Sequence, residues 1–157
     1  MNKQLKISKQ AGFTLIELVV VIVILGLLAA AALPKFINVT QDARIASLNG
    51  IAGGLRTAAS LARAEYVVTG NNAAVTVVMD GQNVAVLAES ALAGRGGRPT
   101  QAATGISIAM PNPDGYTVSH AGATSTYTPT SGGAATCQVR YDADALGDPV
   151  SVVITTC

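Results

Sequence analysis

Hydrophobic side chains are concentrated in one long stretch near the N-terminus, residues 13–33, in which only Thr14 and Glu17 are strongly polar. A helix of this length spans about 30 Å, the thickness of the hydrocarbon core of a bilayer. A buried helix of a soluble protein rarely stays apolar on all sides over such a length. The pattern therefore predicts a membrane-spanning helix, and Pro34 ends the apolar run.

The next segment, residues 35–68, has an amphipathic pattern. Its apolar side chains recur at spacings of four and three, which predicts a helix with one buried face. These side chains are Leu48, Ala52, Leu55, Ala59, Ala62 and Tyr66. Arg56, Ser60 and Arg63 lie off this stripe, so we expect them to face solvent or a neighbouring molecule.

Glycines interrupt the amphipathic segment at three positions, Gly50, Gly53 and Gly54. Glycine weakens a helix interior, but small residues also permit the close approach of a packed sheet, and we favour this second interpretation. The turn sequence at residues 69–72, Thr-Gly-Asn-Asn, predicts the end of the helix.

Beyond residue 72 the composition changes to Val, Thr, Ser and Gly, and short β-type segments alternate with turn sequences. The predicted strands are residues 75–79, 84–87, 106–110, 116–119, 138–141 and 150–155. Residues 88–104 are expected to form a longer loop with at most one helical turn. Because the strands need a partner for their apolar face, the predicted fold class is α+β, one long N-terminal helix whose second half packs on a small antiparallel sheet.

Composition narrows the classes of function. Hydrophobic residues make up 50% of the chain and charged residues 12%, which excludes an intrinsically disordered protein. A formal net charge of +1 offers no basic excess, so no nucleic-acid partner is expected. One His and two Cys leave little material for a zinc site. No catalytic set of residues and no cofactor motif is recognisable, so we do not predict an enzyme.

The charge is distributed unevenly. Residues 1–12 contain Lys3, Lys6 and Lys9 and no acid, whereas the remaining residues hold seven basic and nine acidic side chains, a net charge of −2. Basic residues before a membrane-spanning helix predict a cytoplasmic N-terminus and an external remainder. Two simpler interpretations stay open, a secretory signal peptide cleaved near residues 29–32 and a plain membrane anchor.

Glu17 fits neither of these simpler interpretations. An acidic side chain within the membrane costs about 2.5–3.5 kcal/mol and therefore indicates a function and a partner. No Lys or Arg lies within residues 13–33. Cleavage between Gly12 and Phe13 would create an α-amino group with a reference pKa of about 7.7–8.0, roughly one helical turn from Glu17.

The sequence Gly-Phe-Thr-Leu-Ile-Glu at residues 12–17, after a basic leader and before an apolar run, resembles the class III signal of type IV pilins and type II secretion pseudopilins. The resemblance covers residues 1 to about 55. It implies that a membrane-bound prepilin peptidase cuts after Gly12 on the cytoplasmic side and N-methylates Phe13. It also implies an inner-membrane precursor that assembly machinery converts into an extracellular filament.

Glu17 then has a role in a homopolymer. In a filament, its carboxylate can meet the Phe13 amine of a neighbouring copy while the apolar helices pack together. Burial of the apolar side chains supplies the affinity, at about 25 cal/mol per Å², and the ion pair supplies the register. In filaments of the related family the stretch between a Gly and a Pro at such positions is often unwound. The resemblance thus implies that the helix could extend between Gly26 and Pro34; the alternative is that Pro34 only bends the helix.

Cys137 and Cys157 are predicted to form a disulfide bond. The compartment outside the inner membrane is oxidising, and the two last predicted strands can bring the cysteines together. A closed loop of roughly 20 residues contributes about 3 kcal/mol on the entropic model. Type IV pilins resemble this chain in having a C-terminal loop bounded by a disulfide, whereas most pseudopilins lack it.

The predicted organisation is a cleaved leader (1–12), a transmembrane and filament-core helix (13–34), an amphipathic helix (35–70) and a globular β-domain (71–157). Residues 29–39 and the C-terminal Cys are most similar to type IVa major pilins of the mannose-sensitive-haemagglutinin type, which implies surface attachment. The alternatives are a pseudopilin or minor pilin and, from another class, a membrane-anchored adhesive or ligand-binding protein that never polymerises.

Two further motifs are incomplete. Asp142, Asp144 and Asp148 partly match a calcium loop, but position five is Leu146 and position twelve is Val153, so we interpret them as a solvated acidic turn. The Gly-Arg-Gly-Gly-Arg sequence at residues 94–98 lacks the Lys-Ser/Thr of a phosphate-binding loop and is interpreted as an exposed loop.

Overall fold

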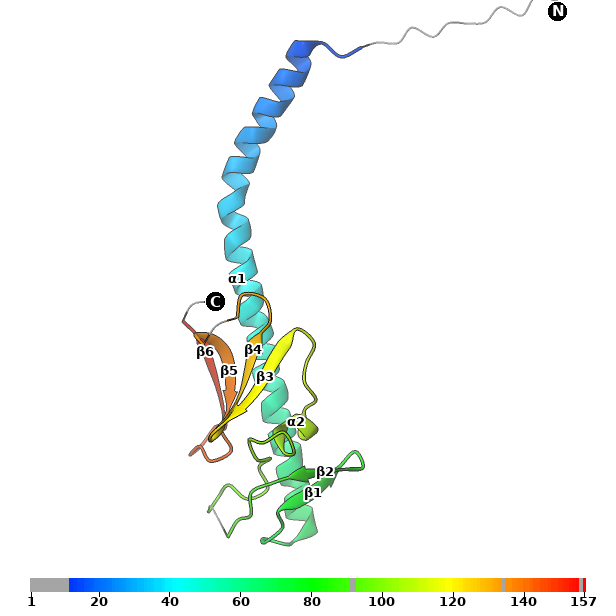
Figure 1. Ribbon diagram of the computed structural model, residues 1–157, viewed down its shortest axis with the longest axis vertical. Coiled ribbons are helices and arrows are strands. Elements are labelled where there is room, and N and C mark those ends of the chain that lie inside the picture. Colours follow the sequence, from blue (N-terminus) through cyan, green and yellow to red (C-terminus); the bar gives the residue numbers. More distant parts are fainter. Residues whose placement is uncertain (1–11, 91–92, 134, 156) are drawn as a thin grey trace, which may run out of the picture. The chain divides into compact units, whose positions relative to one another are not determined.

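The computed structural model describes residues 12–90, 93–133, 135–155 and 157. Nearly all of the predicted leader therefore lies outside the described residues. The chain divides into two compact units, residues 1–40 and residues 41–157. The predicted α+β class is confirmed (Figure 1).

Helix α1 extends over 55 residues, Leu15–Thr69, with Pro34 inside it. Its N-terminal part is long and apolar enough to cross a bilayer by length and composition, with a mean hydropathy of 2.9 over 18 residues. The helix ends where the turn sequence at residues 69–72 predicts its end. Gly26 and Pro34 both lie within the continuous helix, so the extension between them stays a prediction for the filament.

In the unit formed by residues 41–157, a hairpin and a four-stranded sheet follow α1. The hairpin consists of β1 (Thr76–Met79) and β2 (Gln82–Ala85), and the short helix α2 covers Ile106–Ala109. The antiparallel sheet has the strand order β3-β4-β5-β6 and is formed by β3 (Tyr116–Ala121), β4 (Thr124–Pro129), β5 (Cys137–Tyr141) and β6 (Val150–Ile154).

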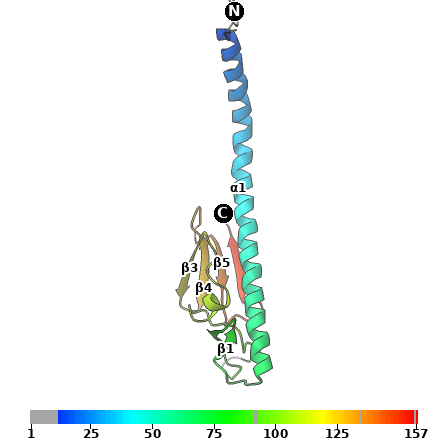
Figure 2. The ribbon, with the colours of Figure 1, turned by 90° about the vertical axis from the view of Figure 1, so that its right-hand side faces the viewer.

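The predicted apolar stripe of the amphipathic helix forms the face of α1 that packs into the core. All six of its members are buried, and Figure 2 shows β3, β4 and β5 alongside the C-terminal half of α1. The first four members of the stripe, from Leu48 to Ala59, pack in one cluster with Tyr127, Val139 and Tyr141 of the sheet. Ala62 and Tyr66 pack in a second cluster with Val77 and Val84 of the hairpin. The helical periodicity therefore predicted the packing face correctly.

The interpretation of the three glycines is wrong for two of them. A Cβ atom added at Gly50 or Gly53 would meet nothing within 4 Å, whereas one at Gly54 would lie 3.0 Å from the sulfur of Met110. Only Gly54 thus permits a close approach, and its neighbour follows α2 instead of belonging to the sheet.

The strand predicted at 106–110 is also wrong, because this segment forms α2. The amide of Ala109 donates to the Gly105 carbonyl at 3.1 Å, and the amide of Met110 donates to the Ile106 carbonyl at 2.8 Å. A short apolar run does not distinguish a strand from a helical turn by periodicity.

Strand β2 begins two residues earlier than predicted, because the turn before it is tight. Asp80 and Gly81 both have positive φ values, 50° and 73°, and Met79 pairs with Gln82 across a two-residue turn. Such turns match the twist of a hairpin and favour Asp-Gly. The turn therefore sets the register at Gln82.

Strand β4 was not predicted, because its sequence, Thr-Ser-Thr-Tyr-Thr-Pro, is mostly polar. It nevertheless lies inside the sheet, and Ser125 and Tyr127 are fully buried. A signal was available in the Gly122-Ala123 pair. Gly122 has a φ of 60° at the first position of a two-residue turn, where glycine is preferred.

We expect Tyr141→Phe to lower the free energy of unfolding by about 1–3 kcal/mol. The buried Tyr141 hydroxyl donates to the Pro99 carbonyl at 2.7 Å, and its loss leaves that carbonyl without this partner. Urea unfolding of the full chain in detergent measures the effect. Tyr127→Phe is the matched control, because its buried hydroxyl has only a looser approach to Ser107 and no hydrogen bond of normal geometry with the described residues. Equal losses in both variants would contradict a role for the hydrogen bond.

Candidate functional site

The chain just before α1 holds the predicted processing point. Gly12, Phe13 and Thr14 are non-helical and exposed, and the Phe13 side chain is 94% exposed. A Cβ atom added at Gly12 would meet nothing within 4 Å. The peptide bond between Gly12 and Phe13 therefore lies in an open, irregular segment, the kind of backbone that a peptidase can bind in extended form.

Thr14 and Glu17 form a reciprocal cap at the start of α1. The Thr14 amide donates to Glu17 Oε2 at 2.9 Å, and the Glu17 amide donates to Thr14 Oγ1 at 3.3 Å. The Thr14 hydroxyl also donates to Glu17 Oε2, at 2.8 Å. A threonine and a glutamate three positions apart in this geometry constitute a capping box, which satisfies backbone N–H groups that have no helical partner.

The Thr-x-x-Glu signal of this cap is present in the sequence, but the cap was not predicted. The positive end of the helix dipole also lies at this carboxylate. Glu17 is thus held within its own chain before any neighbour is present. Both of its described hydrogen bonds are accepted by Oε2, which orients the carboxylate.

The surface around Glu17 is apolar. Phe13, Ile16, Val20 and Val21 line a shallow hollow together with Glu17. The large apolar side chains of residues 13–33 are 42–94% exposed. So much contiguous apolar surface requires a cover of lipid or of other helices. The cap and this surface are the two features of the N-terminal unit that bear on its function.

The second predicted site pairs Cys137 with Cys157, and the structure joins them in a disulfide with a Cα–Cα distance of 5.0 Å. Cys137 is fully buried at the start of β5. Arg44 of α1 donates from Nη1 to the Cys157 carbonyl at 2.8 Å. The C-terminus is therefore attached both to the sheet and to the helix.

Two acidic residues of the incomplete calcium motif, Asp142 and Asp148, have different partners. Asp142 Oδ1 accepts from the Asp144 amide at 2.9 Å. Asp148 forms an ion pair with Arg56, Nε to Oδ2, at 2.8 Å. Within the described ranges, no three His, Cys, Asp or Glu side chains are grouped so that they could hold a metal ion.

Glu89 organises the Gly-Arg loop. Its carboxylate accepts hydrogen bonds from the amide of Gly94 and, at 2.9 Å, from the amide of Gly96. These two bonds, that of Gly94 first, hold the pKa of Glu89 below its ordinary value of 4.5; burial opposes the shift and the charge of Arg63 adds to it. The loop at residues 94–98 is therefore held by a carboxylate that must stay ionised.

Because the pKa of Glu89 is lower in the folded than in the unfolded chain, its stabilisation is present above about pH 4.5 and lost as the pH falls through the folded pKa. We expect the wild type to lose stability on acidification over this window and Glu89→Gln to lose less. Urea unfolding at about pH 7 and about pH 3 measures the difference. Glu65→Gln, at an exposed position of α1, is the control and should follow the wild type. An unchanged acid response in Glu89→Gln would contradict the assignment.

Comparison with known proteins assigns the N-terminal segment. Residues 7–33 match the family described as the prokaryotic N-terminal methylation motif. Over 51 residues the chain is 47% identical to the type IV narrow pilus major component PilA5 of Thermus thermophilus, covering 32% of this chain and 44% of the relative. It is 45% identical over 56 residues to a fimbrial protein of Moraxella nonliquefaciens, covering 36% of each.

A third relative is the type IV major fimbrial protein FimA of Dichelobacter nodosus, 43% identical over 51 residues, which are 32% of this chain and 33% of the relative. The match thus spans less than half the length of these curated relatives. No solved structure matches the chain. The family match lies within residues 7–33, and each of these relatives covers about a third of this chain.

Proposed function

We propose that the chain is a type IV pilin and the repeating structural subunit of an extracellular pilus filament, because its N-terminal segment matches the methylation motif and resembles pilus and fimbrial proteins. The observation that carries the proposal is the combination of this motif with a long, exposed apolar helix. The named relatives are pilus and fimbrial proteins, which supports a structural and not a catalytic role.

We propose that assembly depends on Phe13 and Glu17. Cleavage after Gly12 by a prepilin peptidase gives Phe13 a positively charged amine, which the peptidase then methylates. In the filament, this amine pairs with Glu17 of a neighbouring copy. The cap with Thr14 supports this, because it orients the carboxylate and leaves Oε1 without a described hydrogen bond to another residue. A carboxylate oxygen has two acceptor positions, so the cap and the pair are compatible.

Hydrophobic burial supplies most of the affinity in this proposal. The exposed apolar side chains of residues 13–33 are covered by lipid in the precursor and by the helices of other copies in the filament. Each Å² removed from water contributes about 25 cal/mol, so helices leaving the membrane are stable only as a bundle. Assembly then places the subunit at the cell surface, after a precursor stage in the inner membrane that uses the assembly machinery there.

Mass spectrometry of the mature N-terminus tests the proposal. We expect a chain that begins with N-methylated Phe13. A chain that retains Met1 would indicate a plain membrane anchor, and one that begins near Ala32 would indicate a secreted domain. Either of these results would overturn the proposal, because both remove the amine that Glu17 requires.

Electron microscopy of sheared surface filaments separates the remaining alternatives. Abundant filaments that consist of this chain are expected for a major pilin. The disulfide-bounded C-terminus favours a major pilin over a pseudopilin. Surface attachment, as in type IVa pilins of the mannose-sensitive-haemagglutinin type, is part of this proposal, as is stretching by extension of α1 between Gly26 and Pro34. A processed chain that forms no filaments would indicate a non-polymerising adhesive protein.

A further inference from the structure

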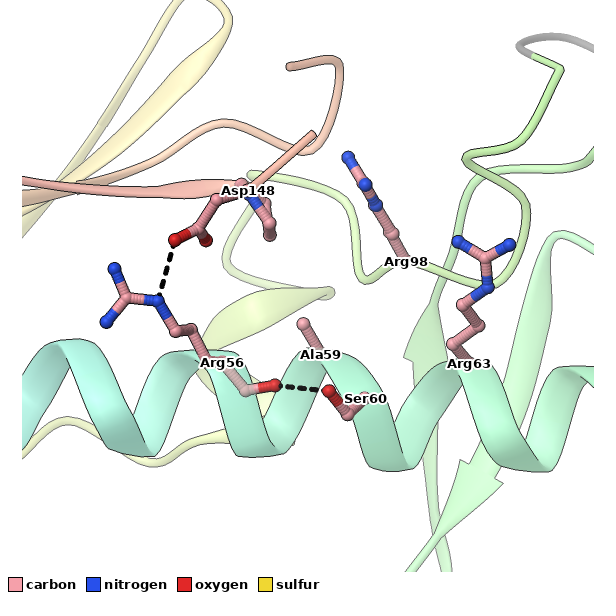
Figure 3. Close-up of a pocket in the computed structure, with 7 residues that line it drawn as sticks. Arg56, Ala59, Ser60, Arg63, Arg98 and Asp148 are labelled. Atoms are coloured by element: carbon pink, nitrogen blue, oxygen red, sulfur yellow. Dashed lines mark hydrogen bonds and ion pairs between the residues drawn. The ribbon is translucent and has the colours of Figure 1, made fainter. Parts of the chain in front are cut away.

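A second cavity, of about 280 Å³, lies in the unit formed by residues 41–157. Helix α1 forms one wall, to which it contributes Arg56, Ser60 and Arg63, spaced four and three residues apart (Figure 3). Two loops form the other wall. The loop residues are Arg98, which follows β2, and Asp148, which precedes β6. The cavity is somewhat smaller than the range of about 300–1,000 Å³ typical of drug-sized ligands, so it fits one compact group.

The positive charge of this pocket is only partly neutralised. Arg98 donates from Nη1 to the Ala145 carbonyl at 2.8 Å and from Nη2 to the Gly147 carbonyl at 2.6 Å. These acceptors are neutral, so they hold the guanidinium in place without cancelling its charge. Arg56 pairs with Asp148, which is the only recorded ion pair in the part of the chain that the structure describes. Among the lining residues, three cations and one anion leave a surplus of two positive charges, of which the Glu89 carboxylate next to the pocket offsets a part at Arg63.

Arg63 keeps most of its hydrogen-bonding capacity. Its one recorded hydrogen bond runs from Nη1 to the Gly94 carbonyl at 2.9 Å. A guanidinium has five N–H donors in a planar fork that matches a carboxylate in a bidentate arrangement. Arg56 uses Nε for Asp148 and one Nη2 donor for the Val150 carbonyl at 3.3 Å. Both helix arginines therefore have N–H groups available for an oxyanion.

The remaining lining decides what kind of anion fits. Ala59 and Pro149 contribute apolar surface, which favours the carbon skeleton of an organic ligand over a bare inorganic ion. The carboxylate of Asp148 repels additional negative charge, which disfavours a dianion. Ser60 donates its hydroxyl proton to the Arg56 carbonyl at 2.8 Å, so its oxygen is oriented as an acceptor for a hydroxyl group.

We propose that this pocket binds a small organic monocarboxylate. Arg56 and Arg63 donate hydrogen bonds to its carboxylate, and the positive charge of Arg98 attracts it. The pocket is separate from the N-terminal assembly segment, because all of its residues belong to the unit of residues 41–157. A pocket that does not bind a carboxylate can therefore be distinguished from a chain that does not assemble into filaments.

Titration of the full chain, kept monomeric in a zwitterionic detergent, tests the proposal. The probe is glucuronate, glucose is the uncharged probe of similar size, and inorganic phosphate is the second anion. Isothermal titration and the Nε–H NMR signals of the arginines report binding. We expect saturable binding of glucuronate, weaker binding of phosphate and none of glucose. Equal responses to glucuronate and glucose, or tighter binding of phosphate, would overturn the proposal.

Two variants locate the site. Arg63→Gln should weaken glucuronate binding at least about tenfold, the effect of losing a charged hydrogen-bond donor. Arg140→Gln makes the same charge change at an exposed position of β5 outside the pocket and should bind as the wild type does. Ser60→Leu keeps all charges, occupies the pocket from an exposed helix position and should also abolish binding. An equal loss in Arg140→Gln, or full binding in Ser60→Leu, would contradict the location.

Discussion

Glu17→Val is expected to insert into the membrane and to be cleaved and methylated, but to yield few or no filaments. Insertion should not suffer, because removal of a carboxylate from a membrane helix saves about 2.5–3.5 kcal/mol. Loss of the pair with the Phe13 amine removes a charged hydrogen bond, worth about 1.5–3 kcal/mol at every contact between subunits. A loss of about tenfold or more in each association step accumulates along a filament. Quantification of pilin in the sheared surface fraction measures the effect.

Two matched variants separate the charge of Glu17 from its capping role. Glu17→Gln keeps an oxygen that can accept from the Thr14 amide, so the cap persists, but it carries no charge. Thr14→Ala removes the hydroxyl of the cap and keeps the charge. We expect Glu17→Gln to assemble as poorly as Glu17→Val, and Thr14→Ala to assemble well. Normal filaments from Glu17→Gln would show that the charge is not required and would remove the charge pair from the proposal.

Replacement of Cys137 and Cys157 by Ala is expected to lower the free energy of unfolding by about 3 kcal/mol, since the bond closes a loop whose ends are 20 residues apart. The loop contains most of β5 and all of β6, so the loss acts on one edge of the sheet. Urea unfolding in detergent measures the effect.

Reduction of the wild-type chain is the control for this variant. It breaks the bond but leaves both sulfur atoms in place, so it separates the loss of the cross-link from the small cavity that alanine creates at buried Cys137. We expect reduction to account for most of the destabilisation. Free thiols in the unreduced, unfolded chain would show that the bond is absent in the protein.

The sheet was harder to predict than the helix, for a reason that β4 and α2 illustrate. A helix is stabilised by contacts three and four residues apart, so the stripe that includes Leu48 and Tyr66 is visible in the order of residues. A strand is stabilised by partners that the local sequence does not identify. The polar strand β4 is an inner strand because β3 and β5 flank it, and Ile106 is buried within a helical turn.

The sequence alone determined the first 69 residues of this protein: the apolar helix, its amphipathic continuation, the acid at Glu17 and the cleavage motif before it. All of these are local patterns, and the Thr14 cap, though overlooked, is local as well. Only the tertiary structure decided that Arg98 and Asp148 meet Arg56 and Arg63 around one cavity. These residues are up to 92 positions apart, and their meeting depends on how the loops close around the packed helix and sheet.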